Sequence, residues 1–405
     1  MESEKNSNEK TAIKPPPRPI PVRRKLTYAV IVILFFVGVP ELFLRFKPPT
    51  VGTGEPSVGT RQFVSWLSNL SVGLSGKDEL YIEDSDRMWK LKAGVQITSA
   101  NFHHAPGAEQ QAIQITINES GHRGPSVNES GHRGPSVATK DTDALRILCM
   151  GDSNFFGYPL DDEHVFPAAL KRALEQNLDG RPVIVTNGGC PGYTVGQGWK
   201  WYESTFSEHE FDVLLLSYLN NDAWQQPYSD QELQHRGTEK DGAFLAAASK
   251  LRTVQWLRSL SEKSPEEYVP RVSLDDFEAT YQNFITTADQ KNAQTIILDF
   301  RAYPNYEAYS RQLQTLASKR VQYFAVRDQA YRHFSGPQPL RRFSKMLPVV
   351  EKRWGKSTLE QYPYLWFYAE FHPEHLNEIG ARWLAEQTAV MIARSTQPHD
   401  KQKAP

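Results

Sequence analysis

The chain has 405 residues, and its 46 lysines and arginines almost balance its 47 aspartates and glutamates, giving a formal net charge of −1 at pH 7. This balance excludes the strong positive field on which nucleic-acid binding commonly depends, and we expect no nucleic-acid partner. With only two cysteines, Cys149 and Cys190, the chain is not a disulfide scaffold. We expect two buried thiols, and a single disulfide between them is the alternative.

The N-terminal segment predicts a membrane anchor. Residues 1–25 form a basic, proline-rich tail with seven lysines and arginines, and residues 26–46 are mostly apolar. This run approaches the ~20 residues that a helix needs to cross a bilayer. The basic excess before it predicts a cytoplasmic N-terminus, so the chain beyond it would lie outside the cytosol, on the periplasmic side of a bacterial inner membrane. A cleaved signal peptide is the alternative, but no A-x-A cleavage pattern follows the run.

The next segment, residues 47–140, predicts a linker followed by an irregular extension, because no helical or strand period persists through it. It contains a tandem copy of ten residues, NESGHRGPSV, at 118–127 and 128–137, so the duplicated stretch is 118–137. Two copies are too few for a repeat architecture. We expect a surface loop that arose by local duplication.

From residue 141 to 396 the pattern predicts one α/β domain, followed by a disordered tail at 397–405. Short apolar runs alternate with helical patterns, which indicates a parallel sheet of about five strands covered by helices on both faces. The predicted strands are 145–150, 182–187, 212–218, 295–300 and 321–326, and the predicted helices are 163–178, 274–292, 305–319 and 376–394.

Candidate site residues follow the strands, where open parallel sheets bind their ligands. GDSNFFG (151–157) follows the first strand and places Ser153 at the start of the next segment. A glycine-rich loop, NGGCPGYTVGQG (187–198), follows the second strand and offers bare backbone N–H groups. LNND (219–222) follows the third, and FHPEHLNEIG (371–380) supplies two late histidines. A serine, backbone and amide donors and a histidine are the parts that acyl transfer requires.

The order and spacing of these blocks resemble those of the SGNH (GDSL) hydrolase superfamily, whose members are serine esterases with a flavodoxin-like three-layer α/β/α fold. The resemblance implies Ser153 as the nucleophile, and an oxyanion hole formed by Ser153, Gly192 and Asn221. The last block of the family is usually Asp-x-x-His with a glycine five residues after the histidine. Gly380 lies five residues after His375, so the resemblance implies His375 as the base.

One position departs from the family pattern. His372 stands three residues before His375, where the family usually has the aspartate that orients the base. We therefore count His372 with the catalytic candidates, and Glu370 or Glu374 could replace the missing carboxylate. Two alternatives stay open: His372 is itself the base, or the two histidines bind zinc. No third zinc ligand is evident, and we expect neither a metal nor another cofactor.

The resemblance extends, less closely, to the N-terminal half. SDRMWKLKAG (85–94) and ITINESGHRG (115–124) resemble segments before the hydrolase domain in membrane-anchored bacterial members. The resemblance thus implies a membrane-anchored esterase or deacylase acting outside the cytoplasm on an acylated carbohydrate or lipid. An O-acyltransferase that uses the same serine, and a binding module with impaired catalysis, are the alternatives.

Overall fold

The structure is a computed structural model that describes residues 80–99, 113–124, 143–178, 181–238, 265–334, 343–369 and 374–396. The predicted cytoplasmic tail, the predicted membrane span at 26–46, the second repeat copy and the predicted C-terminal tail lie outside these ranges. Within them, no helix combines the length and the hydropathy that a membrane crossing requires.

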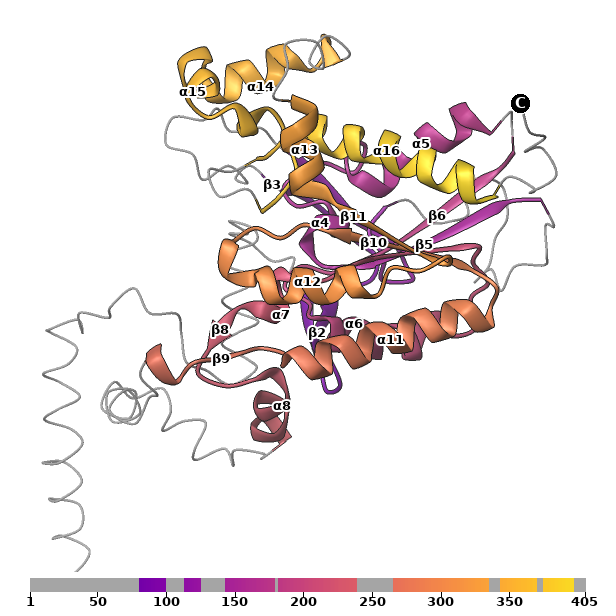
Figure 1. Ribbon diagram of the computed structural model, residues 1–405, viewed down its shortest axis with the longest axis vertical. Helices are drawn as coiled ribbons and strands as arrows, with labels where there is room; N and C mark the ends of the chain where they lie inside the picture. Colours follow the sequence, from indigo (N-terminus) through magenta and orange to yellow (C-terminus); the bar gives the residue numbers. More distant parts are fainter. Residues whose placement is uncertain are drawn as a thin grey trace, which may run out of the picture. The chain divides into compact units, whose positions relative to one another are not determined.

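A five-stranded parallel sheet forms the centre of the domain (Figure 1). Its strands are β5 (Leu145–Gly151), β6 (Val183–Gly189), β7 (Val213–Ser217), β10 (Gln294–Asp299) and β11 (Val321–Ala325). They lie in the order β11-β10-β7-β5-β6, and every neighbouring pair is parallel. All five strands coincide with the predicted ones within two residues at each end.

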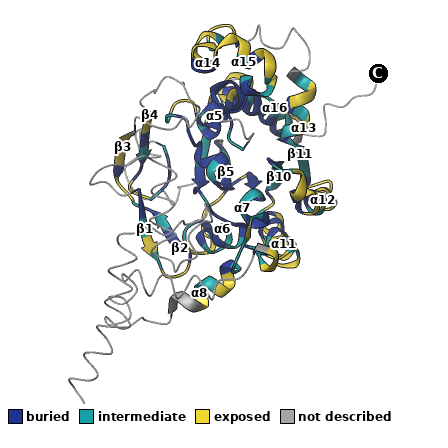
Figure 2. Ribbon diagram, turned by 90° about the vertical axis from the view of Figure 1, so that its left-hand side faces the viewer, coloured by how far each residue is buried: buried dark blue, intermediate teal, exposed yellow. Residues whose placement is uncertain are grey.

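The strands are mostly apolar because both faces of the sheet are covered. In β5, Ile147 and Cys149 face one hydrophobic core, while Leu148 and Met150 face the other. All four are at most 2% exposed, so both faces of β5 are buried at these positions. Figure 2 shows the strands as a buried layer between helices with exposed outer faces. The structure thus confirms the predicted three-layer α/β architecture.

One face of the sheet carries α5 (Phe166–Asn177), α13 (Val326–Phe334) and α16 (Glu378–Thr396). The other carries α6 (Val195–Trp201), α11 (Leu274–Gln290) and α12 (Glu307–Thr315). The remaining described helices are short: α4 (Ser153–Phe156), α7 (Asn220–Ala223), α8 (Asp230–Thr238), α14 (Leu347–Trp354), α15 (Lys356–Gln361), the π-helix η3 (Tyr202–Phe206) and the 3₁₀ turns η4 (Pro265–Glu267), η5 (Pro304–Tyr306) and η7 (Pro363–Trp366).

The strand order defines where a ligand can bind. In chain order the sheet reads 2-1-3-4-5, because β6 lies on one side of β5 and β7 lies on the other. This is the flavodoxin-like order, whose connections leave β5 in opposite directions and open a crevice at the carboxyl ends of β5 and β7. The loops that the sequence singles out after these two strands therefore meet at one place.

The N-terminal extension is more regular than expected. Its described parts form two antiparallel pairs, β1 (Tyr81–Asp84) with β2 (Met88–Leu91) and β3 (Val95–Ser99) with β4 (Ile113–Ile117). A third small pair, β8 (Gln225–Gln226) with β9 (Val269–Pro270), lies within the main domain. The strands of the extension are too short to show a clear period in the sequence, but they share a core with the sheet.

The first copy of the repeat is not the surface loop that we expected, as far as it is described. Arg123 is 3% exposed. Its guanidinium donates to the carbonyls of Phe156 (2.9 Å), Gly157 (3.1 Å) and Leu160, and pairs with Asp162 (3.0 Å). These contacts fix the chain that follows α4, so the extension supports the segment after Ser153.

Candidate active site

Ser153 begins α4 directly after β5. Asp152 caps this helix, and its Oδ1 accepts a hydrogen bond of 2.9 Å from the backbone N–H of Asn154. The end of β6 comes very close to the same helix: a Cβ on Gly189 would lie 2.2 Å from the nitrogen of Phe156. A glycine is therefore required at position 189 for the first two candidate loops to meet.

His375 lies against Ser153 although 222 residues separate them. Its Nε2 is 2.7 Å from the Oγ of Ser153, which is a hydrogen-bond distance. The ring of Tyr158 packs against the imidazole edge-on, with 4.9 Å between the ring centroids. The structure thus places Ser153 next to His375, the histidine that the last sequence block implies as the base.

The backbone around His375 is held by the end of the preceding segment. The N–H of Ala369 donates to the carbonyl of His375 at 2.9 Å, and Tyr368 and Leu376 form an antiparallel bridge. Asn377 then accepts hydrogen bonds from the first N–H groups of α16 at 3.0 Å, as a helix cap does. The histidine is therefore fixed at the entry to a helix whose buried face packs on the sheet.

His372 and Glu370 lie outside the described residues, so their roles stay predictions. Glu374 is described and lines a pocket beside Asn221. Among the described residues, no group of three or more histidine, cysteine, aspartate or glutamate side chains is arranged to hold a metal ion. Cys149 and Cys190 are both buried free thiols, as expected.

The oxyanion candidates Gly192 and Asn221 converge on the same loop. Tyr193 N–H donates to the carbonyl of Cys190 at 3.2 Å, closing a turn in which Gly192 has a φ of 77°. Glycine adopts this left-handed conformation without strain. The Nδ2 of Asn221 donates to the carbonyl of Tyr193 at 3.2 Å and to Asp152 at 3.3 Å. Asn221 therefore ties the loop after β6 to the turn that carries Ser153.

A buried arginine that the sequence analysis missed holds this loop from behind. Arg271 is 2% exposed, and it donates to the carbonyl of Gly192 at 2.7 Å and to Gln197 Oε1 at 3.0 Å. It also donates two bonds to the carboxylate of Asp230, at 2.8 and 3.0 Å. Asp230 accepts a further bond from the hydroxyl of Thr194 at 2.9 Å. The planar guanidinium thus joins the turn at Gly192 to α6 and to α8.

Two buried carboxyl groups lie next to the oxyanion candidates. Burial raises the pKa of Asp152 to about 6, although the hydrogen bonds from Asn154 and the charge of His375 lower it. Burial also raises the pKa of Asp222 to about 8, against the hydrogen bond of 2.7 Å from the N–H of Val195. Asp222 is therefore mostly a neutral acid at pH 7. No described residue forms a hydrogen bond with its Oδ2.

Asp222 gives a testable effect on stability. Its pKa is raised from 3.8 in the folded state, so the folded protein retains a proton that the unfolded chain loses, and stability falls as the pH rises from about 4 to about 8. Asp222→Asn keeps an acceptor for Val195 but has no proton to lose. In urea unfolding, the free energy gained by this variant should be larger at pH 8 than at pH 5 by at least ~1.4 kcal/mol, the equivalent of one pKa unit.

The exposed Asp275→Asn serves as the control for this measurement, because it makes the same side-chain replacement on the surface of α11. A gain for Asp222→Asn that is equal at the two pH values would show that the buried carboxyl does not carry the proton.

Comparison with known proteins gives only distant structural likenesses. No family model matches the sequence, and no curated protein matches it. A lipase/acylhydrolase from Enterococcus faecalis is 13% identical over 63% of this chain and 98% of its own, with a TM-score of 0.38. An acetyl xylan esterase is 15% identical over 61% and 100%, with a TM-score of 0.35. An SGNH-hydrolase family esterase is 16% identical over 63% and 98%, with a TM-score of 0.32. The function is therefore inferred from the geometry of the site.

Proposed function

We propose that the protein is a serine ester hydrolase of the SGNH type, with Ser153 as nucleophile and His375 as general base. The observation that carries the proposal is the 2.7 Å distance between Ser153 Oγ and His375 Nε2 at the carboxyl edge of the sheet. A serine is a weak nucleophile by itself, and an adjacent base within hydrogen-bond reach activates it. The position of this pair in the crevice of a flavodoxin-like sheet supports the same conclusion.

The proposed reaction proceeds in two steps. His375 removes the hydroxyl proton as Ser153 Oγ attacks the acyl carbonyl, and the oxyanion that forms accepts hydrogen bonds from the N–H groups of Ser153 and Gly192 and from Nδ2 of Asn221, which exchanges its 3.3 Å bond to Asp152 for the oxyanion. His375 then gives the proton to the leaving alkoxide, which leaves an acyl group on Ser153. Water, activated by the same histidine, hydrolyses this ester. An acceptor alcohol in place of that water would make the protein an O-acyltransferase.

The pocket beside the proposed site supports an acylated carbohydrate as the substrate, in preference to a lipid. It has a volume of about 420 Å³ and is lined by asparagines, aromatic residues and Glu374. Amide groups can form hydrogen bonds with sugar hydroxyls, and aromatic rings offer flat apolar faces to sugar rings. A lipid chain would be better matched by a groove without so many polar side chains.

The first prediction concerns the nucleophile. Ser153→Ala removes the attacking oxygen and should reduce turnover of p-nitrophenyl acetate to the level of a blank reaction, with no loss of folding. The control is Ser310→Ala, which removes a buried hydroxyl on α12 that donates to Asp299, and this variant should keep its activity. Turnover by Ser153→Ala equal to that of the parent chain would show that Ser153 is not the nucleophile and would overturn the proposal.

A second prediction concerns Arg271, which we expect to position Gly192. Arg271→Lys keeps the charge opposite Asp230 but cannot reach Gly192, Gln197 and both carboxylate oxygens at once. A displaced oxyanion donor weakens the bond made in the transition state, so kcat should fall about 10–100-fold while KM changes little.

The matched control for Arg271→Lys is Arg87→Lys. Arg87 also forms a two-point contact with a carboxylate, that of Asp84, whereas the bond to the carbonyl of Gly192 comes from Arg271. If the two variants lose the same kcat, or if Arg271→Lys is as active as the parent with its fold intact, Arg271 has no positioning role.

The proposal includes membrane anchoring through residues 26–46, with the catalytic domain outside the cytoplasm. Its support is the apolar run and the basic residues before it. An alkaline phosphatase fused after residue 405 should be active in a bacterial host, because this enzyme requires an extracytoplasmic location. The topology would be contradicted if this phosphatase fusion is inactive while a second fusion after residue 405, to a protein that fluoresces only in the cytoplasm, is fluorescent.

A further inference from the structure

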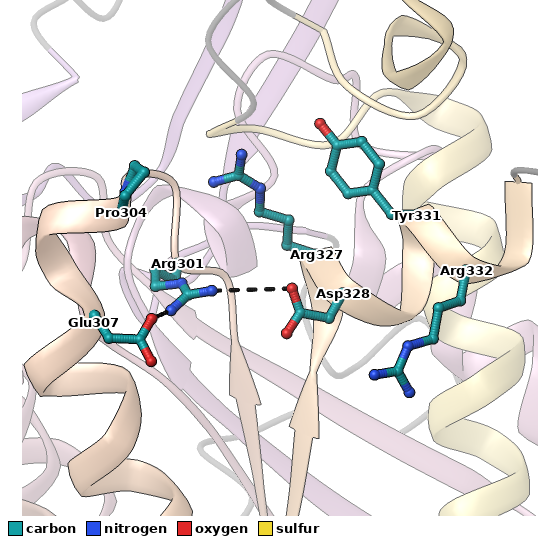
Figure 3. Close-up of a pocket in the computed structure, with 7 residues that line it drawn as sticks. All are labelled: Arg301, Pro304, Glu307, Arg327, Asp328, Tyr331 and Arg332. Atoms are coloured by element: carbon teal, nitrogen blue, oxygen red, sulfur yellow. Dashed lines mark ion pairs between the residues drawn. The ribbon is translucent and has the colours of Figure 1, made fainter.

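A second pocket lies at the carboxyl ends of β10 and β11, on the same edge of the sheet as Ser153. Its volume is about 510 Å³, and it is lined by three arginines, two carboxylates, Pro304 and Tyr331 (Figure 3). The mechanism above uses none of these residues. Arginine concentrated in a hollow at a sheet edge that binds ligands calls for a functional explanation.

The arginines of this pocket differ in their partners. Arg301 forms an ion pair with Glu307 and a longer one, of 4.0 Å, with Asp328. Arg327 donates to the carbonyl of Ala302 and lies 5.7 Å from the ring centroid of Tyr331. Figure 3 shows its guanidinium between Pro304 and Tyr331, directed away from the two carboxylates. No described carboxylate forms an ion pair with Arg327, so its charge is available to a ligand.

The two pockets share a wall. Arg301 and Pro304 line the arginine pocket, while Tyr303 and Tyr306 of the same segment line the pocket beside Asn221. Ala302, in the middle of this wall, contacts both sides: its N–H donates to the side chain of Asn220 at 3.0 Å, and its carbonyl accepts from Arg327. The pocket beside Asn221 thus lies between Asn221 and Arg327.

The dimensions fit an extended ligand. Along the carboxyl edge, Ser153 follows β5, Asn221 follows β7, the shared wall follows β10 and Arg327 follows β11. Three strand spacings of ~4.8 Å separate β5 from β11, a span of about 14 Å. A short oligosaccharide can cover such a distance, with an ester at one end and a charged group at the other.

We propose that Arg327 binds the carboxylate of an acidic sugar, so that the substrate is an acylated carbohydrate containing uronic acid residues. This inference rests on the proposed function, because it places the ester at Ser153. A planar guanidinium that no described carboxylate engages matches a ligand carboxylate in two-point geometry. The lining carries three arginines and the two carboxylates Glu307 and Asp328, a net charge of +1, so the pocket favours a single anionic group.

The test compares acetylated galacturonate oligomers with acetylated xylose oligomers of the same length. The parent chain should have the higher kcat/KM for the acidic substrate, and this preference should weaken as salt is added. Arg327→Gln should raise KM for the acidic substrate about tenfold, as expected for loss of a charged hydrogen bond, and leave the neutral substrate unchanged. Arg320→Gln is the control, because Arg320 directly precedes β11 at the opposite edge of the sheet.

Binding to the Ser153→Ala variant separates this inference from the proposed function. Unacetylated trigalacturonate should bind this variant more tightly than xylotriose in calorimetry, and the added Arg327→Gln change should remove the difference. If p-nitrophenyl acetate is hydrolysed but neither substrate class is preferred, the acidic-sugar inference is wrong and the esterase proposal survives. Equal losses for Arg327→Gln on both substrates, or equal binding of the two oligomers, would also overturn the inference.

Discussion

The contact between Ser153 and His375 depends on the packing of α16 against α5 and the sheet. The histidine shortly precedes α16, and the buried face of this helix contributes Trp383 and Leu384 to the core that also contains Ile147 of β5. Burial of large apolar side chains contributes roughly 1.5–3 kcal/mol each. That packing forms far from the reacting atoms. It places His375 at the carboxyl end of β5, where its Nε2 lies within hydrogen-bond distance of Ser153 Oγ.

The loops around this contact cannot hold their shape by themselves, because they are short or rich in glycine. Two buried arginines that lie outside the sheet hold these loops in place. Arg123, from the N-terminal extension, binds three carbonyls at and just after the end of α4, and Arg271 binds Gly192 and α6. Removing one partner of such a buried ionic contact costs about 3–5 kcal/mol, so both arginines also stabilise the fold. The extension is therefore part of the site's support.

The sheet was predictable from the sequence because each strand is a short, mostly apolar run, which is typical of a strand covered on both faces. The loops that carry Ser153, Gly192 and Asn221 were predictable because they follow such strands, and the resemblance to the SGNH hydrolases implied these three residues within them. No local sequence pattern indicates the roles of Arg271, Asp230 and Arg123, because their contacts join segments that are distant in the chain. The short strands of the extension were missed for a related reason: four or five residues show too little alternation to indicate a strand.

The central claim is that Ser153 is an activated nucleophile, and its chemical reactivity is the most direct test. A fluorophosphonate reacts covalently with a serine that an adjacent base activates, and the modified residue can be identified by peptide mass spectrometry. We predict one adduct, on Ser153, whose formation is lost in His375→Ala while the fold is retained. An unmodified Ser153, or a Ser153 adduct that forms at the same rate without His375, would contradict the account.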